Sequence, residues 1–196
     1  VYTFNFIDRQ ILVILQEPIK ADLGLSDTQL GLLTGFSFAV VYVTAGIPIA
    51  WLADRSNRRN IVAASLGIFS VMTALSGLVQ NYTQLLLARL GVGLGEAGGS
   101  PPSHSMLSDY FPEEKRGTAL SIYTTGIYFG IFFGYFAGGW IAESFGWRKA
   151  FFIVGIPGIA LALLLLLLVR EPSRTQPIAS TVSSQPRFPE TISVLL

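Results

Sequence analysis

The sequence predicts an all-α membrane protein, a bundle of six transmembrane helices, and three observations lead to this fold class. The mean hydropathy is +0.56. Only 13% of the 196 residues are charged, whereas a soluble domain carries about 25%, so much of the surface is expected to face lipid. Six apolar stretches come close to the length of about 20 residues that crosses a bilayer, and no alternation typical of a membrane barrel is visible. The predicted helices are residues 1–16, 29–52, 61–79, 84–107, 118–141 and 149–169.

The distribution of lysine and arginine predicts the orientation of this bundle. Eight of these residues follow the second, fourth and sixth predicted helices, and three follow the first and fifth. Because positively charged segments stay in the cytoplasm, both ends of the chain are expected there, with a bacterial inner membrane as the expected location. The first group is Arg55, Arg58, Arg59, Lys115, Arg116, Arg170, Arg174 and Arg187, and the second is Lys20, Arg148 and Lys149.

The ends of the chain suggest how it is organised into domains. The sequence begins within an apolar run and becomes polar after the sixth predicted helix. We therefore interpret residues 1–170 as an amino-terminal six-helix bundle whose first helix is truncated. Residues 171–196 are interpreted as a cytoplasmic linker toward a second six-helix half.

The composition excludes several functional classes. The chain has no cysteine and one histidine, His104, so disulfides, thiolate metal sites and sites with several histidines are excluded. A net charge of +1 provides no footprint for nucleic acid. No phosphate-binding loop is present in the sequence. We therefore expect neither a metal nor a cofactor.

Four charged residues lie inside the predicted helices: Asp8, Arg9, Arg89 and Glu96. At the helical rise, Asp8 is about 15 Å below Pro18, the predicted outer end of the first helix, and Glu96 is about 18 Å below the outer start of the fourth. Ionisable groups at this depth are costly and usually functional, so we expect them to face the bundle interior. Burial favours a neutral carboxylate and a nearby arginine favours an ionised one, which suits a group that takes up and releases a proton. The alternative is a static bridge that only fixes helix packing.

A short pattern follows the second predicted helix and occurs again after the fifth. Asp54 precedes the basic pair 58–59, and Glu143 precedes the basic pair 148–149. In a 3+3 inverted repeat these two segments lie on opposite faces of the membrane. Such a repeat would explain why the pair 148–149 departs from the charge rule, although a chance similarity is the alternative.

Residues 50–59, AWLADRSNRR, are similar to the G-x-L-A-D-R-x-G-R-R signature of the major facilitator superfamily. Ala50 and Asn57 stand where the signature has glycine, and Asn57 is expected to keep the turn because asparagine tolerates left-handed backbone. The resemblance implies that this segment latches helix ends at the cytoplasmic face. The residues of this predicted cytoplasmic gate are Asp54, Arg55, Arg58 and Arg59.

Residues 89–97, RLGVGLGEA, are similar to the R-x-x-x-G-x-G-x-A signature of proton-linked members of that superfamily. Asn57, the segment 95–97 and residues 5–9, NFIDR, resemble the Spinster-like branch. The branch implies export of lipids such as lysophospholipids or sphingoid phosphates. It also implies that the aspartate of the first helix and the arginine and glutamate of the fourth take part in proton coupling.

Glycines of the predicted fourth and fifth helices are spaced for close helix packing. Four of them recur every fourth residue along 118–141 and therefore lie on one stripe, and those of 89–97 let a neighbouring backbone approach. The expected packing glycines are Gly91, Gly93, Gly95, Gly126, Gly130, Gly134 and Gly138.

Together these features predict a secondary active transporter, and not an enzyme, for an amphipathic or lipid-like solute. Its expected partners are the solute, protons, the bilayer and the second six-helix half. Two alternatives stay open. In one, the chain is a membrane-embedded acyltransferase in which His104 acts as a base oriented by Asp109. In the other, it is a membrane scaffold without transport activity.

Overall fold

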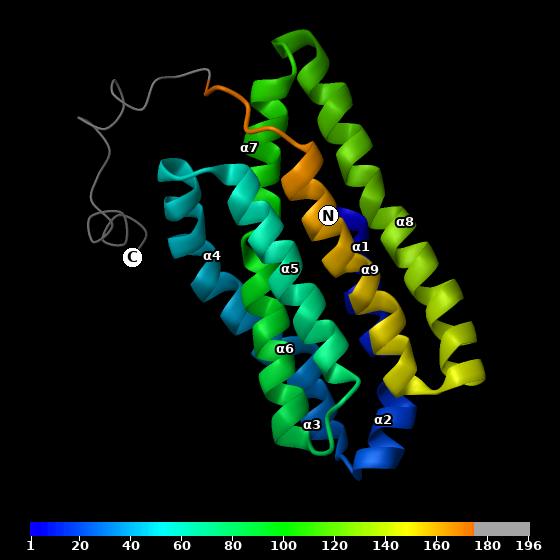
Figure 1. Cartoon of the computed structure of the whole chain (residues 1–196). Coiled ribbons are helices and arrows are strands. Elements are labelled where there is room, and N and C mark those ends of the chain that lie inside the picture. Colours follow the sequence, from blue (N-terminus) through cyan, green and yellow to red (C-terminus); the bar gives the residue numbers. More distant parts are fainter. Residues whose placement is uncertain (175–196) are drawn as a thin grey trace.

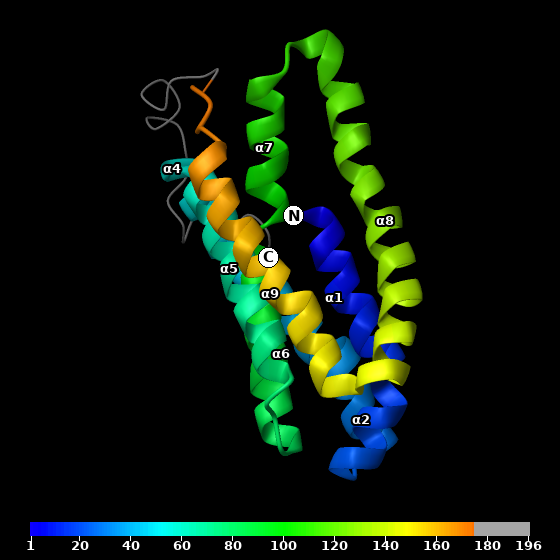
Figure 2. The same cartoon turned by 45° about the vertical axis from the view of Figure 1, so that its right-hand side comes forward.

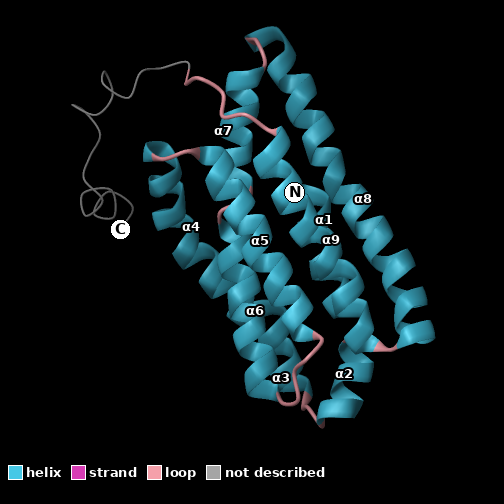
Figure 3. Ribbon diagram, in the orientation of Figure 1, coloured by secondary structure: helices cyan, strands magenta, loops and turns pink. Residues whose placement is uncertain are grey.

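The computed structural model describes residues 1–174, and within this range every regular element is helical (Figure 1 and Figure 3). The predicted linker therefore lies outside the described residues from position 175 onward. The elements are α1 (Tyr2–Ile14), α2 (Gln16–Leu23), α3 (Asp27–Gly31), the π-helical η1 (Leu32–Phe36), α4 (Ser37–Arg55), α5 (Arg58–Ser76), α6 (Tyr82–Ala97), α7 (Ser100–Tyr110), α8 (Glu113–Phe145) and α9 (Trp147–Leu168).

These elements form six rods, which we call spans and which confirm the predicted six-helix bundle. Span one consists of α1 and α2, span two of α3, η1 and α4, and span four of α6 and α7. Spans three, five and six are the single helices α5, α8 and α9. Among the described residues, spans two, three, five and six are each long and apolar enough to cross a membrane. Spans one and four are each divided into two shorter helices, which the sequence did not reveal.

Span one extends further than predicted. We placed its outer end near Pro18, but α2 continues to Leu23 and stops at Gly24, whose φ of 63° is left-handed. The chain leaves helical geometry at Leu15 (φ −84°, ψ 1°), so Pro18 falls in the first turn of a new helix, where a residue without an N–H is tolerated. Asp8 therefore lies about 22 Å from the outer end of the span along its axis.

Span four breaks at Gly98 and Gly99, just after Glu96. The next helix, α7, begins with the prolines 101–102 in its first turn, where their fixed φ is compatible with helix formation. A Cβ atom added at Gly98 would collide with the hydroxyl of Ser65 on α5. The absence of a side chain at Gly98 therefore also permits close contact between α5 and span four.

The six spans form two inverted repeats of three. Span one packs on span five as span four packs on span two, and spans three and six pack on each other. Figure 2 shows α1 running beside α8 on one side of the bundle, with α5 and α9 together on the other. In each repeat it is the first helix that is interrupted, a feature common to helices that carry intramembrane sites.

The bundle has two ends, which we name by their turns and by the predicted orientation. The inner end contains the α4–α5 turn, and the outer end contains the α8–α9 turn, at opposite ends of the molecule in Figure 1. The larger apolar core lies toward the outer end. It includes Leu15, Ile19, Leu30, Trp147 and Phe151.

The glycine stripe of α8 is the surface on which α1 lies. A Cβ atom added at Gly130 would be 2.6 Å from the main-chain oxygen of Thr3 and from the Cβ of Phe6. One added at Gly134 would be 2.7 Å from the Cβ of Gln10. Such separations require a residue without a side chain. Gly126 and Gly138 continue the stripe against α1, and on α6 Gly91 and Gly95 meet α5 whereas Gly93 meets α4.

We predict that Gly130→Ala destabilises the full-length protein, whereas Gly139→Ala does not. Both changes add one methyl group to α8, but a Cβ at Gly139 has no neighbour within 4 Å. Overpacking at Gly130 should cost about 1–3 kcal/mol. The loss should appear as a lower melting temperature in detergent, measured from the fraction of protein that stays monodisperse on heating. Equal melting temperatures for the two variants would contradict the packing described here.

Candidate functional site

The four predicted intramembrane charges meet as two ion pairs that join span one to span four. Asp8 Oδ2 lies 3.0 Å from Arg89 Nη1. Arg9 donates to Glu96 Oε2 through Nη2 at 2.6 Å and through Nε at 2.8 Å. Because Asp8 and Arg9 are adjacent while Arg89 and Glu96 are two helical turns apart, the pairs lie one above the other along α6. We call these four residues the charge cluster.

The two pairs differ in exposure. Asp8, Arg89 and Glu96 are at most 2% exposed, whereas the side chain of Arg9 is 37% exposed. Thr73 on α5 also donates a hydrogen bond to Asp8, so the Asp8–Arg89 pair is closed on several sides. The Arg9–Glu96 pair is the more accessible one, because one of its two side chains is partly exposed.

Aromatic rings surround the exposed arginine. The guanidinium carbon of Arg9 lies 4.8 Å from the ring centre of Phe38, 5.4 Å from that of Phe6 and 5.5 Å from that of Tyr42. Cation–π attraction stabilises a guanidinium at such distances. The rings come from spans one and two, so the charge of Arg9 lies among mainly apolar side chains.

Several polar atoms of the site lack a hydrogen-bond partner within the described residues. They are Glu96 Oε1, Nε and Nη2 of Arg89, and Asn5 Oδ1. Buried polar atoms are usually satisfied, and exceptions often mark functional positions. The site therefore has hydrogen-bonding capacity beyond the two ion pairs.

Sequence reasoning missed Thr73, Phe38 and Tyr42 as members of this site. A sequence signal existed for Thr73, because the third predicted helix carries several hydroxyl residues within an apolar stretch. In the structure Ser65, Thr73 and others of this group are buried on α5. Nothing comparable marked Phe38 and Tyr42, since aromatic residues are frequent throughout the chain.

The predicted cytoplasmic gate forms a second network, centred on Arg58. This residue is 3% exposed and binds Asp109 of α7 at 2.6 Å, Ser105 at 2.7 Å and Glu171 at 2.8 Å. Glu171 also accepts from the main-chain N–H of Arg59 at 2.7 Å. The start of span three is thereby tied to the ends of spans four and six.

The remaining gate residues take different positions. Arg55 stacks on Trp51 of its own helix, 4.1 Å from the ring centre, and Asp54 is exposed. Arg174 donates to the carbonyls at the end of α4, at 2.8 Å to both Ala53 and Ser56. A cation there also complements the negative end of the helix dipole.

The turn at Asn57 is kept as expected, but our expectation about its backbone conformation was wrong. This residue does not adopt the left-handed conformation of glycine but has φ −72° and ψ 108°. Its side chain instead accepts from the N–H of Asn60 at 2.9 Å and caps α5. Asparagine is a preferred N-cap residue, so it keeps the turn by a different mechanism.

The geometry does not support the catalytic pair of the acyltransferase alternative. Asp109 is bound to Arg58, and Nδ1 of His104 lies 2.8 Å from the carbonyl of Ser100. The histidine ring packs edge-on against Tyr2 and Tyr123. Residues five apart on a helix also point to different faces, so His104 is not oriented by Asp109.

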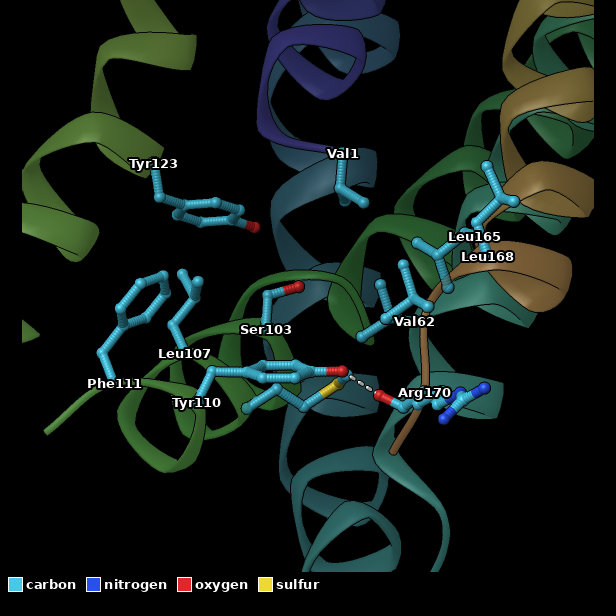
Figure 4. Close-up of a pocket in the computed structure, with 12 residues that line it drawn as sticks. Val1, Val62, Ser103, Leu107, Tyr110, Phe111, Tyr123, Leu165, Leu168 and Arg170 are labelled. Carbon is cyan, nitrogen blue, oxygen red and sulfur yellow. Dashed lines mark hydrogen bonds between the residues drawn. The ribbon is translucent and has the colours of Figure 1, made fainter. Parts of the chain in front are cut away.

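An apolar cavity of 620 Å³ lies near this histidine at the inner end. Its lining comes from α5, α7, α8, the end of α9 and the start of the chain (Figure 4). In Figure 4 the hydroxyl of Tyr110 donates to the carbonyl of Arg170 across one side of the cavity. No member of the charge cluster lines it.

Six helices in two inverted triplets, with charges joining the two interrupted helices, define one half of a membrane transport fold. The chain matches the Major Facilitator Superfamily over residues 1–195 and belongs to that family. It is an integral, multi-pass membrane protein.

Three relatives illustrate the similarity. An MFS-type efflux pump of Mycolicibacterium smegmatis is 42% identical over 167 residues, which make up 85% of this chain and 39% of the pump. A probable galactarate/D-glucarate transporter of Bacillus subtilis is 33% identical over 180 residues, 89% of this chain and 39% of that protein. A crystal structure of a bacterial homologue of the human lysosomal transporter Spinster, inward-facing and unoccupied, has a TM-score of 0.79 at 40% identity, covering 89% of this chain and 42% of that one.

The chain thus spans about two fifths of the length of these relatives. All three are named as transporters, pumps or their homologues. This agrees with the expectation that the chain is not an enzyme.

We predict that Asp8→Asn destabilises the full-length protein by about 3 kcal/mol, because it leaves Arg89 charged and buried without its carboxylate. The matched change Asp27→Asn should alter stability by less than about 1 kcal/mol, since Asp27 is 86% exposed in its pair with Lys20. Thermal and denaturant unfolding in detergent would measure both. Similar losses for the two variants would show that the buried pair contributes no more than a surface pair.

Proposed function

We propose that this chain is the amino-terminal half of a proton-linked secondary active transporter for an amphipathic solute. The observation that carries the proposal is the Arg9–Glu96 pair. A fully buried carboxylate is held by an arginine whose side chain is 37% exposed. This arrangement allows the carboxylate to exchange its partner, which a closed structural bridge does not.

Protonation of Glu96 is the step that the geometry favours. In its ionised form Glu96 holds Arg9 through two hydrogen bonds to one oxygen. A proton on the carboxylate removes the attraction, and Arg9 is then left to solvent or to an anionic group of the solute. A cation at membrane depth is costly without a counter-charge, so proton uptake and anion binding at this site reinforce one another.

The second pair, Asp8–Arg89, is the fixed part of the site in this proposal. It is buried on both sides and receives the hydroxyl of Thr73, so its partners are not free to exchange.

The side chains around Arg9 suggest the class of solute. Phe6, Phe38 and Tyr42 offer an apolar surface around one cation, which suits a molecule with an apolar body and an anionic head. A lysophospholipid or sphingoid phosphate fits that description and follows from the Spinster-like resemblance. Sugar acids, which a relative is named as carrying, share the anionic group but lack the apolar body.

The rest of the protein follows from the same proposal. The solute site lies between this half and a second six-helix half, near the middle of a bacterial inner membrane. Both ends of the segment are cytoplasmic. The gate residues Asp54, Arg55, Arg58 and Arg59 stabilise closure of the inner end.

Glu96→Gln in the full-length protein should abolish the response of transport to an imposed pH gradient while the protein remains folded. Glutamine imitates the protonated carboxylate and cannot release a proton. Uptake of a fluorescent lysophospholipid into proteoliposomes, with and without a pH gradient, measures the effect. Glu114→Gln, at an exposed position of α8, is the control and should follow pH like the parent.

Two results would argue against this assignment. A Glu96→Gln variant that responds to the pH gradient like the parent would remove Glu96 from proton coupling. Loss of folded protein, with an unchanged pH response in the remainder, would make the pair a structural bridge. If the protein takes up galactarate and not the lysophospholipid, the proposed solute class is wrong, whereas the proposed proton coupling is unaffected.

A further inference from the structure

The pattern that occurs after spans two and five marks two equivalent contacts at opposite ends of the bundle. At the inner end, Arg58 is the first residue of α5, and it binds Asp109, the penultimate residue of α7. At the outer end, Arg148 is the second residue of α9, and it binds Asp22, the penultimate residue of α2. Each arginine therefore begins the third span of one repeat and binds the end of the first span of the other.

The second contact of each arginine follows the same rule. Nη2 of Arg58 donates at 3.3 Å to the carbonyl of Pro172, which follows α9. Nη2 of Arg148 donates at 3.2 Å to the carbonyl of Val79, which follows α5. These two contacts are exchanged when the two repeats are exchanged, whereas the further contacts of Arg58 with Ser105 and Glu171 have no counterpart at Arg148 within the described residues.

The acidic residues of the two turns are also equivalent. Asp54 lies near the end of α4 and Glu143 near the end of α8, and these helices hold the same place in the two repeats. Both side chains are exposed, and neither forms an ion pair within the described residues 1–174. A carboxylate at the carboxyl end of a helix is electrostatically unfavourable. At the end of α4 Arg174 of this half supplies a cation to the neighbouring carbonyls, whereas within the described residues Glu143 has no cationic partner in an ion pair and can accept one from outside this half.

Stability of the half alone does not account for the outer contact. Arg148 and Asp22 are 41% and 44% exposed, and exposed ion pairs contribute about 0–1 kcal/mol. The pair does, however, set the position of the α8–α9 turn against spans one and three. It thereby also fixes the position of Glu143 relative to spans one and three.

We propose that the turn from Glu143 to Lys149 is an outer latch, the inverted counterpart of the cytoplasmic gate. Arg148 is its positioning residue, and Glu143 binds a cationic group of the second six-helix half when the outer side is closed. Asp54 does the same at the inner end when that side is closed. The proposal rests on the two-half transporter proposed above, but it requires neither proton coupling nor a particular solute.

Sided labelling of the full-length protein tests this directly. Ala45 lies one turn from Tyr42 on the same side of α4, and these 196 residues contain no cysteine. A cysteine introduced by Ala45→Cys, in a background otherwise free of cysteine, reports access from outside to a membrane-impermeant maleimide. No solute and no pH gradient are needed, so the result stands apart from that of Glu96→Gln.

In this background, Glu143→Gln should raise the rate of labelling from outside about fivefold, the shift that corresponds to about 1 kcal/mol in the conformational equilibrium. Arg148→Gln should act in the same direction, Asp54→Asn should lower the rate, and Glu143→Asp should retain the parental rate. Glu17→Gln is the matched control. Glu17 is an exposed carboxylate at the same end of the bundle, but it lies in the first turn of α2, where the helix dipole already favours it.

An unchanged labelling rate for Glu143→Gln would overturn the proposal. The same holds if Glu17→Gln raises the rate as much as Glu143→Gln does, because the effect would then be one of general charge. If Arg148→Gln yields no folded protein, Glu143→Gln decides the matter alone, since Glu143 has no ion pair to lose within the part of this half that the structure describes.

Discussion

Neutralisation of charge between spans one and four is the constraint on which this bundle depends. Asp8, Arg9, Arg89 and Glu96 would each be costly alone at membrane depth. They are compatible with the fold because each lies against an opposite charge on the other span. The pairs thus serve as contacts between the two repeats, and in the function proposed above they are also the site of proton uptake.

The backbone is arranged so that these pairs can form. Glycines on α8 let α1 approach without an intervening side chain, and glycines on α6 do the same toward α4 and α5. The breaks at Leu15 and at Gly98–Gly99 lie beyond the charged residues along spans one and four. Packing, interruption and charge therefore occur on the same two helices, in accordance with the inverted repeat.

Much of the fold could be predicted because hydropathy and charge position are properties of single segments. The six spans follow from apolar length, and the placement of the four charges inside spans one and four follows from the same segments. The interruption of span one could not be predicted, because a proline is compatible both with the end of one helix and with the first turn of the next. The sequence around Pro18 does not distinguish these two cases. The turn at Asn57 was misjudged because one residue type serves both left-handed turns and N-caps.

The partners of the site residues were the least predictable part. The sequence placed all four charges inside helices but did not show that Arg89 and Glu96 each bind a residue of span one. Such pairing depends on the rotation of two helices about their axes, which a local pattern does not determine. The aromatic residues around Arg9 were unpredictable for the same reason, because Phe38 and Tyr42 belong to span two.

The contact of α1 with the glycine stripe has a mechanical consequence. With no side chain between them, α1 and α8 form one stiff unit, and the close approach at Gly93 joins α6 to α4 in another. The charge cluster lies on the seam between these two units. In the function proposed above, a change in the protonation of Glu96 therefore acts on the contact between these two units.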